Sequence, residues 1–430
     1  MNVAYAKFLA RKQTQVERAG SHVAAADINP LLHHWQNLLV QWAVHTSRAA
    51  IWADTGLGKT FMQLEWARLS ADRRALIIAP LAVCQQTIRE AAKLGIDAHY
   101  IRNTDEVETH RMCVTNYERL PAIDPELFDA VVLDESSILK QSDGATRTML
   151  IEWARTVPHR LACSATPAPN DPEELTNQAE WLGRMTRTHM LAAFFIHDQN
   201  GWRLKGHGRR PMIEWMAQWA VALTRPSDVG GDDAGYILPG LDVIPEIVSA
   251  DIEVEGQLFA TDIGGVTGRA ELRRKTLDAR VARGAELVEQ SPGPWILWCG
   301  LNQEANALAA AIPGSVNVTG SLDASKKAEL LLGFADGDYN VLITKPSIAS
   351  QGLNYQHCSQ MAFVGLGDSY EQYYQAIRRC YRYGQTKVVR AHVIVSDLET
   401  QIAANVARKE RQASLITREL IAETQRQRIA

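Results

Sequence analysis

The stretch "IWADTGLGKT", residues 51–60, decides the fold class. It runs from an apolar segment through a turn with two glycines, Gly56 and Gly58, into the helix-like run "FMQLEWARL". A glycine-rich turn between a strand and a helix presents backbone N–H groups to phosphate oxygens. We therefore expect an α/β fold with a phosphate site at this turn, formed by Thr55, Gly56, Leu57, Gly58, Lys59 and Thr60.

Two side chains of this turn supply the chemistry that a nucleotide requires. Lys59 can reach the β- and γ-phosphates as a point charge, and the Thr60 hydroxyl can bind magnesium. The general phosphate-loop pattern has a glycine five residues before Gly58, where this chain has Ala53. The strict pattern thus fails by one methyl group, and the alternative interpretation is a glycine-rich turn that carries Gly-Lys-Thr by chance.

A second stretch, "VVLDESSILK" at residues 131–140, places two acids directly after an apolar run. Adjacent carboxylates at a strand end repel each other unless a cation lies near them. A magnesium ion on ATP needs a carboxylate from a neighbouring strand, and a water aligned for attack needs a base. We assign Asp134 to the magnesium side, and Glu135 either as the base or as the residue that orients the water. Acids at a strand end alone are a weak indication of an ATP site. They become a strong indication when they lie in the same α/β lobe as Lys59.

Short apolar runs alternate with helix-like stretches over most of the chain. The strand-like runs are 49–53, 75–79, 112–115, 130–133 and 160–164 in the first half, and 295–299, 315–318, 340–344, 361–364 and 391–395 in the second. Runs that are apolar on both faces, with helices between them, are typical of parallel sheets covered on both sides. The sequence therefore predicts two α/β lobes, each a mostly parallel sheet with helices on both faces.

Between and beyond the two lobes the composition changes, so that we expect five parts. They are an N-terminal helix (1–27), a first, ATP-binding lobe (28–182), a helical, basic and tryptophan-rich insertion with a linker (183–240), a second lobe (241–398) and a charged C-terminal helix (399–430). Within the insertion, "MIEWMAQWAVAL" is consistent with one amphipathic helix, because Trp215 and Trp219 are four residues apart.

The bulk properties limit the classes of partner. The net charge is −4, so a polyanion would have to be bound by local patches rather than by the overall field. No apolar run approaches the ~20 residues that cross a bilayer, and we expect no membrane partner. The six cysteines form no CxxC pair and are expected to be buried free thiols. We expect a cytoplasmic protein.

At this point the motifs together resemble those of superfamily-two helicases and translocases, and within them the Swi/Snf-like branch, over residues 28–398. "ADTGLGKT" resembles motif I, and "LDES" occupies motif II. "SATPAPND" (164–171) is similar to motif III, with Ser164, Ala165 and Thr166. "SQGLNYQ" (350–356) resembles motif V, and "QAIRRCYRYGQ" (375–385) is close to the Swi/Snf motif VI pattern QAxxRxxRxGQ. The sequence as a whole also resembles small helicases encoded by bacteriophages and prophages. For such a helicase the expected compartment is the bacterial host cytoplasm.

This resemblance implies two RecA-like lobes, with ATP and Mg²⁺ bound in the cleft between them. It implies that Gln36, which precedes motif I, reads adenine. It also implies that residues near four positions touch the nucleic-acid backbone, namely Pro80, Asn116, Thr344 and Gly352.

Motif VI has a physical rationale of its own. Gln375, Arg379 and Arg382 are spaced i, i+4 and i+7, which puts them on one stripe of a helix. Two guanidinium groups on one face suit a triphosphate held by another lobe, where arginine fingers stabilise the transferring phosphoryl group. We assign Arg379 and Arg382 as fingers and Gln375 to positioning water or phosphate. The alternative is a basic surface helix.

Two positions depart from the family pattern. Ser136 and Ser137 stand where the family usually has Ala-His after the two acids, and that histidine usually helps couple the ATP site to the second lobe. Arg378 stands where Swi/Snf proteins often carry an acid, and either contacts phosphate or DNA or points to solvent.

A second candidate DNA surface follows Trp202, because basic residues bind phosphates while an aromatic ring stacks on a base. Its basic members are Arg203, Lys205, Arg209 and Arg210. The alternative is a solvated loop with Trp202 tucked into the core.

These observations predict an ATP-dependent DNA helicase or translocase that acts on single-stranded, duplex or forked DNA. The alternatives are a protein-displacing remodeller or motor subunit without strand separation, an RNA helicase, and a non-motor phosphate-loop NTPase. A non-motor NTPase would have no use for the stripe in "QAIRRCYRYGQ". Protein partners, polarity and oligomeric state are not indicated by the sequence.

Overall fold

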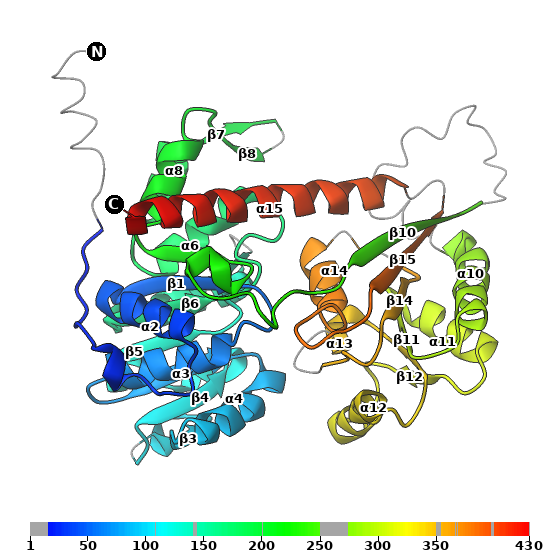
Figure 1. The fold of residues 1–430 in the computed structure, drawn as a ribbon, viewed down its shortest axis with the longest axis horizontal. Helices are drawn as coiled ribbons and strands as arrows, with labels where there is room; N and C mark the ends of the chain where they lie inside the picture. The colour runs from blue at the N-terminus through cyan, green and yellow to red at the C-terminus, as the bar shows by residue number, and fades with distance from the viewer. Residues whose placement is uncertain are drawn as a thin grey trace. The chain divides into compact units, whose positions relative to one another are not determined.

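The computed structural model describes residues 16–107, 109–140, 144–199, 201–249, 274–349, 354–365, 367, 369–396 and 400–429. The chain forms two compact units, one of residues 1–234 with 411–430 and one of residues 235–410. Figure 1 shows the elements of each unit. No helix among the described residues is long and apolar enough to cross a membrane.

The first unit is built on a seven-stranded sheet in the order β3-β4-β2-β5-β6-β1-β9 (Figure 1). All of its strand pairs are parallel, as expected. The strands are β1 (Arg48–Ala53), β2 (Ala75–Ala79), β3 (Ala98–Tyr100), β4 (Met112–Asn116), β5 (Ala130–Leu133), β6 (His159–Cys163) and β9 (Ala220–Leu223). The five predicted strands of this lobe are confirmed, because each is an apolar run that is buried on both faces.

Helices connect these strands, as parallel pairing requires. They are α2 (His34–Thr46), α3 (Lys59–Ser70), α4 (Leu81–Lys93), α5 (Ala145–Trp153), α6 (Leu175–Trp181), α7 (Arg187–Phe194) and α8 (Arg209–Met216). A short antiparallel hairpin, β7 (Phe195–Asp198) with β8 (Gly201–Leu204), lies between α7 and α8.

The segment 212–223 is not one helix, which corrects the expectation. Helix α8 ends at Met216, the chain turns, and β9 pairs in parallel with β1 at the sheet edge. Trp215 and Trp219 are both buried and pack edge to face, 5.3 Å apart, so the spacing of four reflected a shared core rather than a continuous helix. The segment after residue 183 therefore contributes a strand to the first sheet.

The second unit holds a six-stranded parallel sheet in the order β10-β15-β14-β11-β13-β12. The strands are β10 (Leu241–Val248), β11 (Trp295–Trp298), β12 (Val316–Val318), β13 (Val341–Thr344), β14 (Gln360–Phe363) and β15 (Val389–Ser396). The five predicted strands are confirmed. The edge strand β10 was not predicted, and it contains Pro245, which an edge position tolerates because one side of the strand donates no ladder hydrogen bonds.

The helices of the second unit are α10 (Leu277–Gln290), α11 (Asn302–Ala311), α12 (Ala324–Asp336), α13 (Pro346–Ala349) and α14 (Tyr370–Ile377). The expected C-terminal helix is α15 (Thr400–Ile429). From this helix, Ile416 and Leu420 are buried in the hydrophobic core of the first unit, beside strands and helices from residues 50 to 222. Of the expected N-terminal helix (1–27), residues 1–15 lie outside the described residues. Residues 16–27 form no α-helix and contain only a short 3₁₀ turn at Ala25–Asp27, which corrects that part of the expectation.

Candidate functional site

The predicted phosphate loop lies between β1 and α3. Strand β1 ends at Ala53 and α3 begins at Lys59, so that the five residues between them form the turn. Gly56 and Gly58 have φ values of 84° and 71°, a left-handed conformation that glycine adopts without a steric penalty. A Cβ at Gly58 would also lie 2.3 Å from Gln36 Nε2. Both predicted glycines are therefore required by the backbone of the turn.

Hydrogen bonds to Ala53 and Asp54, at the start of this turn, stabilise its conformation. The Asp54 carboxylate accepts a hydrogen bond from the Thr55 backbone N–H at 2.6 Å, and Leu57 N donates to Asp54 O at 3.4 Å. Lys59 Nζ donates to the carbonyls of Ala53, at 2.8 Å, and Asp54, at 3.3 Å. Thr60 is the second residue of α3 and is half-buried. Because carbonyls leave the ammonium charge uncompensated, Lys59 keeps its electrostatic attraction for phosphate.

Gln36, whose predicted role is to read adenine, lies against the phosphate loop. Its Nε2 donates to Leu57 O at 3.1 Å, and its Oε1 accepts from His33 N at 2.9 Å. The side chain is buried. These contacts attach the start of α2 to the loop, while the role in reading adenine stays a prediction.

Asp134 occupies the end of β5 and is almost fully buried. Its Oδ1 accepts hydrogen bonds from Gln63 Nε2 at 2.7 Å and from Glu135 N at 3.1 Å. Burial raises the pKa of the Asp134 carboxyl, against the opposing effects of the Gln63 hydrogen bond and the Lys59 charge. A buried carboxylate that lacks full compensation, in a site with the Thr60 hydroxyl, fits a magnesium ion that takes its other ligands from phosphates and water.

Glu135 follows in a strained backbone conformation. Its φ of 50° lies in the left-handed region, which costs a residue with a side chain roughly 1–2 kcal/mol. Its Oε2 accepts a hydrogen bond of 3.4 Å from the Ser164 hydroxyl, and Ser164 Oγ in turn accepts one from Thr166 N at 3.0 Å. The motif II acid therefore contacts motif III through Ser164. Strain of this kind concentrates at functional sites.

Ser136 and Ser137 do not supply that contact through their hydroxyls. Both are buried, and Ser136 Oγ has no hydrogen-bond partner within the described part of the chain. The Ser136 carbonyl instead accepts a hydrogen bond from Gln178 Nε2 at 2.9 Å. Three residues at this site were not predicted, namely Gln63, Gln178 and Tyr117, whose hydroxyl donates to Asp134 O at 2.6 Å. Only the folded structure brings them there, since each lies in a helical segment distant in sequence from the loop it contacts.

Motif VI is only partly helical, which corrects the predicted stripe. Helix α14 ends at Ile377, so Gln375 lies in the helix while Arg379 and Arg382 lie in the turns after it. Arg379 is buried and its Nη2 donates to Gln375 Oε1 at 3.3 Å, which keeps these two predicted residues together. Arg382 Nη1 instead hydrogen-bonds Asn354 Oδ1 of the motif V stretch. Burial, followed by the charge of Arg378, lowers the pKa of Arg382.

Arg378 and Gln385 have internal roles in this turn. The Arg378 guanidinium lies 5.2 Å from the ring centre of Tyr374 and 5.3 Å from that of Tyr381, where cation–π attraction holds it. The buried Gln385 amide donates to the carbonyls of Cys358, at 3.0 Å, and Cys380, at 3.2 Å. Gln385 therefore stabilises the turn.

The predicted backbone-contact residues are mostly engaged within the fold. Asn116 is buried, accepts from Tyr100 OH at 2.5 Å and donates to Glu118. Thr344 is buried at the end of β13 and donates to Val318 O at 3.1 Å. Pro80 is buried at the start of α4. Gly352 lies outside the described residues.

The basic residues near Trp202 each have a partner. Arg203 pairs with Asp198 at 2.5 Å, Arg210 with Glu214 at 2.7 Å and Arg209 with Glu419 at 2.8 Å. Lys205 Nζ donates to the Ala192 carbonyl at 2.7 Å. Trp202 lies on the hairpin, 36% exposed and edge to face with His197, so it is not tucked into the core.

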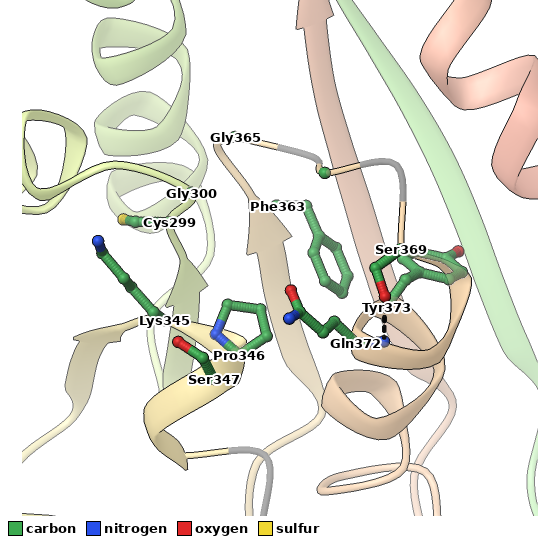
Figure 2. Close-up of a pocket in the computed structure, with 11 residues that line it drawn as sticks. Cys299, Gly300, Lys345, Pro346, Ser347, Phe363, Gly365, Ser369, Gln372 and Tyr373 are labelled. Carbon is green, nitrogen blue, oxygen red and sulfur yellow. Dashed lines mark hydrogen bonds between the residues drawn. The ribbon is translucent and has the colours of Figure 1, made fainter. Parts of the chain in front are cut away.

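The second unit has a cavity of about 160 Å³ at the carboxyl ends of β11, β13 and β14 (Figure 2). Its wall is part polar and part aromatic, formed by Cys299, Gly300, Lys345, Pro346, Ser347, Phe363, Gly365, Gly367, Ser369, Gln372 and Tyr373. Gly300 N and Leu301 N both donate to Glu304 Oε2 at 2.8 Å, and Glu304 is paired with Arg280, so a buried ion pair supports one side of the cavity.

Comparison with known families divides the chain in the same way. Residues 28–168 match the family model of the type III restriction enzyme res subunit, and residues 289–384 match that of the helicase conserved C-terminal domain. A solved structure, the Sulfolobus solfataricus SWI2/SNF2 ATPase core in complex with dsDNA, aligns over 94% of this chain and 96% of its own, at 15% identity and a TM-score of 0.45. No curated protein matches the chain.

One family match covers the phosphate loop and both motif II acids, and the other covers the arginines of motif VI. The chain belongs to the superfamily-two helicases.

Proposed function

We propose that this protein is an ATP-driven motor on DNA, a helicase or translocase that hydrolyses ATP between its two RecA-like lobes. The observation that carries the proposal is the arrangement of motifs I, II and III in the first unit. There Lys59 lies in a glycine-shaped loop, its charge acts on the buried Asp134, and Glu135 contacts Ser164.

Each residue of this set has a distinct task. The backbone N–H groups of residues 55–60 and the Lys59 ammonium bind the phosphates. Thr60 and Asp134 would hold magnesium, which neutralises charge on the phosphate oxygens when bound. Glu135 orients the attacking water and accepts its proton. Gln36, attached to the loop through Leu57 O, reads adenine.

Arg379 and Arg382 of the second unit complete the proposed mechanism as arginine fingers. Their guanidinium groups stabilise the charge that develops on the transferring phosphoryl group, as fingers do in other nucleotide hydrolases. Closure on ATP and reopening after hydrolysis would then advance the motor along the nucleic-acid backbone.

Steady-state ATPase measurements, with and without DNA, test the proposal. We expect the wild type to hydrolyse ATP faster when DNA is present. Lys59→Ala should lose nucleotide binding, and Glu135→Gln should bind ATP but hydrolyse it at least ~100-fold more slowly, as is typical when a general base is removed. Hydrolysis that ignores DNA and survives both substitutions would contradict the proposal.

The finger assignment has a separate test. Arg382→Ala should reduce the catalytic rate ~10³-fold with little change in ATP affinity, since a finger acts on the transition state. Hydrolysis at the wild-type rate, with DNA still bound, would show that Arg382 has only a structural role beside Asn354.

A translocase that moves on duplex DNA without separating its strands is the second candidate. The motif "QAIRRCYRYGQ" favours it, because this is the Swi/Snf-like pattern. Strand-displacement and streptavidin-displacement assays, run on the same DNA, separate the two activities. Hydrolysis rates with single-stranded DNA, duplex DNA, forked DNA and RNA identify the substrate and would reveal an RNA helicase.

A further inference from the structure

Helix α6 contacts the motif II loop through the amide side chains of two consecutive residues. Asn177 Nδ2 donates to Leu139 O at 2.7 Å. Gln178 Nε2 donates to Ser136 O at 2.9 Å and to Pro167 O at 3.2 Å. Gln178 is completely buried. One side-chain amide thus joins the residue directly after Glu135 to the residue directly after Thr166.

The orientation of this amide follows from its partners. A side-chain amide nitrogen has two N–H donors, which match the two carbonyl oxygens at Ser136 and Pro167. The flipped amide would place its oxygen against both carbonyls and lose both bonds. The two loops are therefore linked through a donor that few other side chains of this size could supply.

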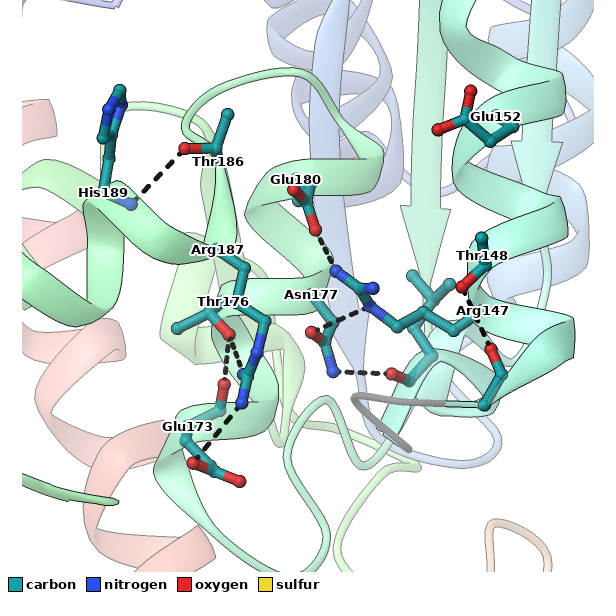
Figure 3. Close-up of polar contacts among 12 residues, drawn as sticks. Arg147, Thr148, Glu152, Glu173, Thr176, Asn177, Glu180, Thr186, Arg187 and His189 are labelled. Carbon is teal, nitrogen blue, oxygen red and sulfur yellow. Dashed lines mark hydrogen bonds and ion pairs between the residues drawn. The ribbon is translucent and has the colours of Figure 1, made fainter. Parts of the chain in front are cut away.

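Helix α6 is itself fixed by arginines from two other helices, α5 and α7. Arg147 Nε of helix α5 donates to Asn177 Oδ1 at 3.1 Å, and its guanidinium also pairs with Glu180 (Figure 3). Near the start of α6, Arg187 Nη1 donates to Thr176 Oγ1 at 2.8 Å and lies near Glu173 (Figure 3). The helix that carries Gln178 is accordingly a well-anchored support.

The residue that needs this support is Glu135. Its left-handed backbone costs roughly 1–2 kcal/mol and persists only where the surroundings impose it. The peptide before it is held by Tyr117, whose hydroxyl donates to Asp134 O at 2.6 Å. The peptide directly after it is held at Glu135 O, which accepts a hydrogen bond from Ile138 N at 3.0 Å, and the next peptide is held by Gln178 at Ser136 O. Gln178 also holds the loop of Ser164, which contacts the Glu135 carboxylate.

We propose that Gln178 is a positioning residue for hydrolysis, which keeps Glu135 aligned by joining the motif II loop to the motif III loop. In this chain it supplies the connection that the hydroxyls of Ser136 and Ser137 do not make. This inference rests on the proposed ATPase function, and it assigns a role to a residue outside the helicase motifs.

The test compares Gln178→Met with Thr176→Val in the full-length protein. Gln178→Met keeps the length of the side chain but removes both donors. Thr176→Val removes a buried hydroxyl from the same helix, which donates to Glu173 O at 2.6 Å, accepts from Arg187 Nη1 at 2.8 Å and contacts neither loop. We expect Gln178→Met to lower kcat ~10-fold, the effect of about one lost hydrogen bond in the transition state, with the KM for ATP nearly unchanged. Thr176→Val should keep the wild-type kcat.

Melting temperature separates positioning from general damage. Both variants lose buried hydrogen bonds of α6 and should melt a few degrees below the wild type. If Thr176→Val loses kcat in proportion to its melting temperature, as Gln178→Met does, the effect is structural and the inference is overturned. A Gln178→Met protein with the wild-type kcat overturns it as well.

Gln178→Glu provides a readout that a structural role would not produce. A protonated carboxyl has one O–H donor and can restore one of the two bonds, whereas a carboxylate faces both carbonyls without a donor. Its kcat, divided by that of the wild type, should therefore rise as the pH falls from about 8.5 to about 6.5, because a buried carboxyl holds its proton more tightly. A pH-independent ratio would contradict the positioning role. Wild-type protein without ATPase activity would instead refute the proposed function.

Discussion

At the scale of single residues, Asp134 is a carboxylate that the fold holds at an energetic cost. It is buried at the end of β5, accepts two hydrogen bonds at one oxygen, and has Lys59 as the cation whose charge acts on it. A bound divalent cation would offset the free-energy cost of burying the Asp134 charge. The burial that disfavours the carboxylate without a metal therefore favours metal binding. The two adjacent acids of motif II therefore differ in task. Asp134 is buried where a cation would offset its charge, whereas Glu135 has a strained backbone and its carboxylate contacts Ser164 of motif III.

Asp134→Asn should make the protein more stable at neutral pH while abolishing hydrolysis. The asparagine oxygen can accept the same bonds from Gln63 and Glu135 without carrying a buried charge. Because burial raises the pKa of Asp134 in the folded state, the folded protein binds this proton more tightly than the unfolded chain does. The free energy of unfolding of the wild type therefore falls, relative to that of the variant, as the pH rises through the pKa of Asp134 in the folded state.

Thermal or denaturant unfolding without nucleotide and metal measures this difference. We expect Asp134→Asn to exceed the wild type near pH 8, and the gap to close as the pH falls and Asp134 becomes protonated. A wild type that is as stable as the variant at pH 8 would show that Lys59 and the hydrogen bonds already offset the burial of the charge.

At the scale of elements, strand β9 holds the first residue of the phosphate loop from the edge of the sheet. It pairs with β1 along four residues, and Asp54 N donates to Leu223 O at 3.0 Å. The strand that leads into the loop is therefore flanked on both sides, by β6 and β9. A part of the chain far from the motifs in sequence holds the first residue of the turn.

Val221→Asp, in the middle of β9, should destabilise the first unit by about 3–5 kcal/mol, because it buries an unpaired charge. ATP binding should weaken with it, since Asp54 begins the phosphate loop. Arg210→Ala is the control in the neighbouring helix α8, and should leave the unfolding free energy nearly unchanged, because its side chain is 81% exposed. Unfolding curves for Val221→Asp that match the wild type would contradict the role of β9.

Elements that carry one strong local signal were predictable, and those that depend on tertiary pairing were not. The runs 75–79 and 130–133 are apolar on both faces, and only a central strand of a parallel sheet uses such a run. Strand β9 continues a helical pattern without a break, so nothing local marks the turn after Met216. In motif VI the spacing of Gln375, Arg379 and Arg382 fits a helix, but the chain leaves the helix at Ile377 and Arg382 turns to Asn354.

The candidate site was predictable to the same extent. Glycines at left-handed positions and adjacent acids after a strand are visible in sequence, because the chemistry requires those residue types at that spacing. Gln63 and Gln178 were not visible, since an isolated glutamine in a helix has no pattern. Only their hydrogen bonds in the folded structure place them at the site, from Gln63 to Asp134 and from Gln178 to Ser136.

At the scale of the whole molecule, net charge opposes rather than assists DNA binding. With a net charge of −4, attraction for a polyanion must come from local groups that can exchange an internal partner for phosphate. Arg203 and Arg210 are the best placed of the basic residues near Trp202, with side chains 63% and 81% exposed. Surface ion pairs of this kind contribute little to stability, so little is lost when phosphate replaces the carboxylate.

The double variant Arg203→Glu with Arg210→Glu tests this surface. We expect DNA affinity to fall and the slope of log affinity against log salt to decrease by about 1–2, as when one or two phosphate contacts are lost. Arg155→Glu with Lys93→Glu is the control of equal charge change, at two exposed positions elsewhere in the first unit. An equal loss of affinity in both double variants would indicate a general charge effect, and would remove the hairpin from the proposed DNA surface.

The placement of Ile416 and Leu420 has a consequence for how the protein is made. Both side chains belong to the hydrophobic core of the unit that also contains the phosphate loop, yet they follow every helicase motif in the sequence. A ribosome that has translated every helicase motif has still not supplied the last apolar groups of the ATP-binding unit. That core can close only after Ile416 and Leu420 have left the exit tunnel, so nascent chains expose an incompletely packed ATP-binding unit until these two residues emerge.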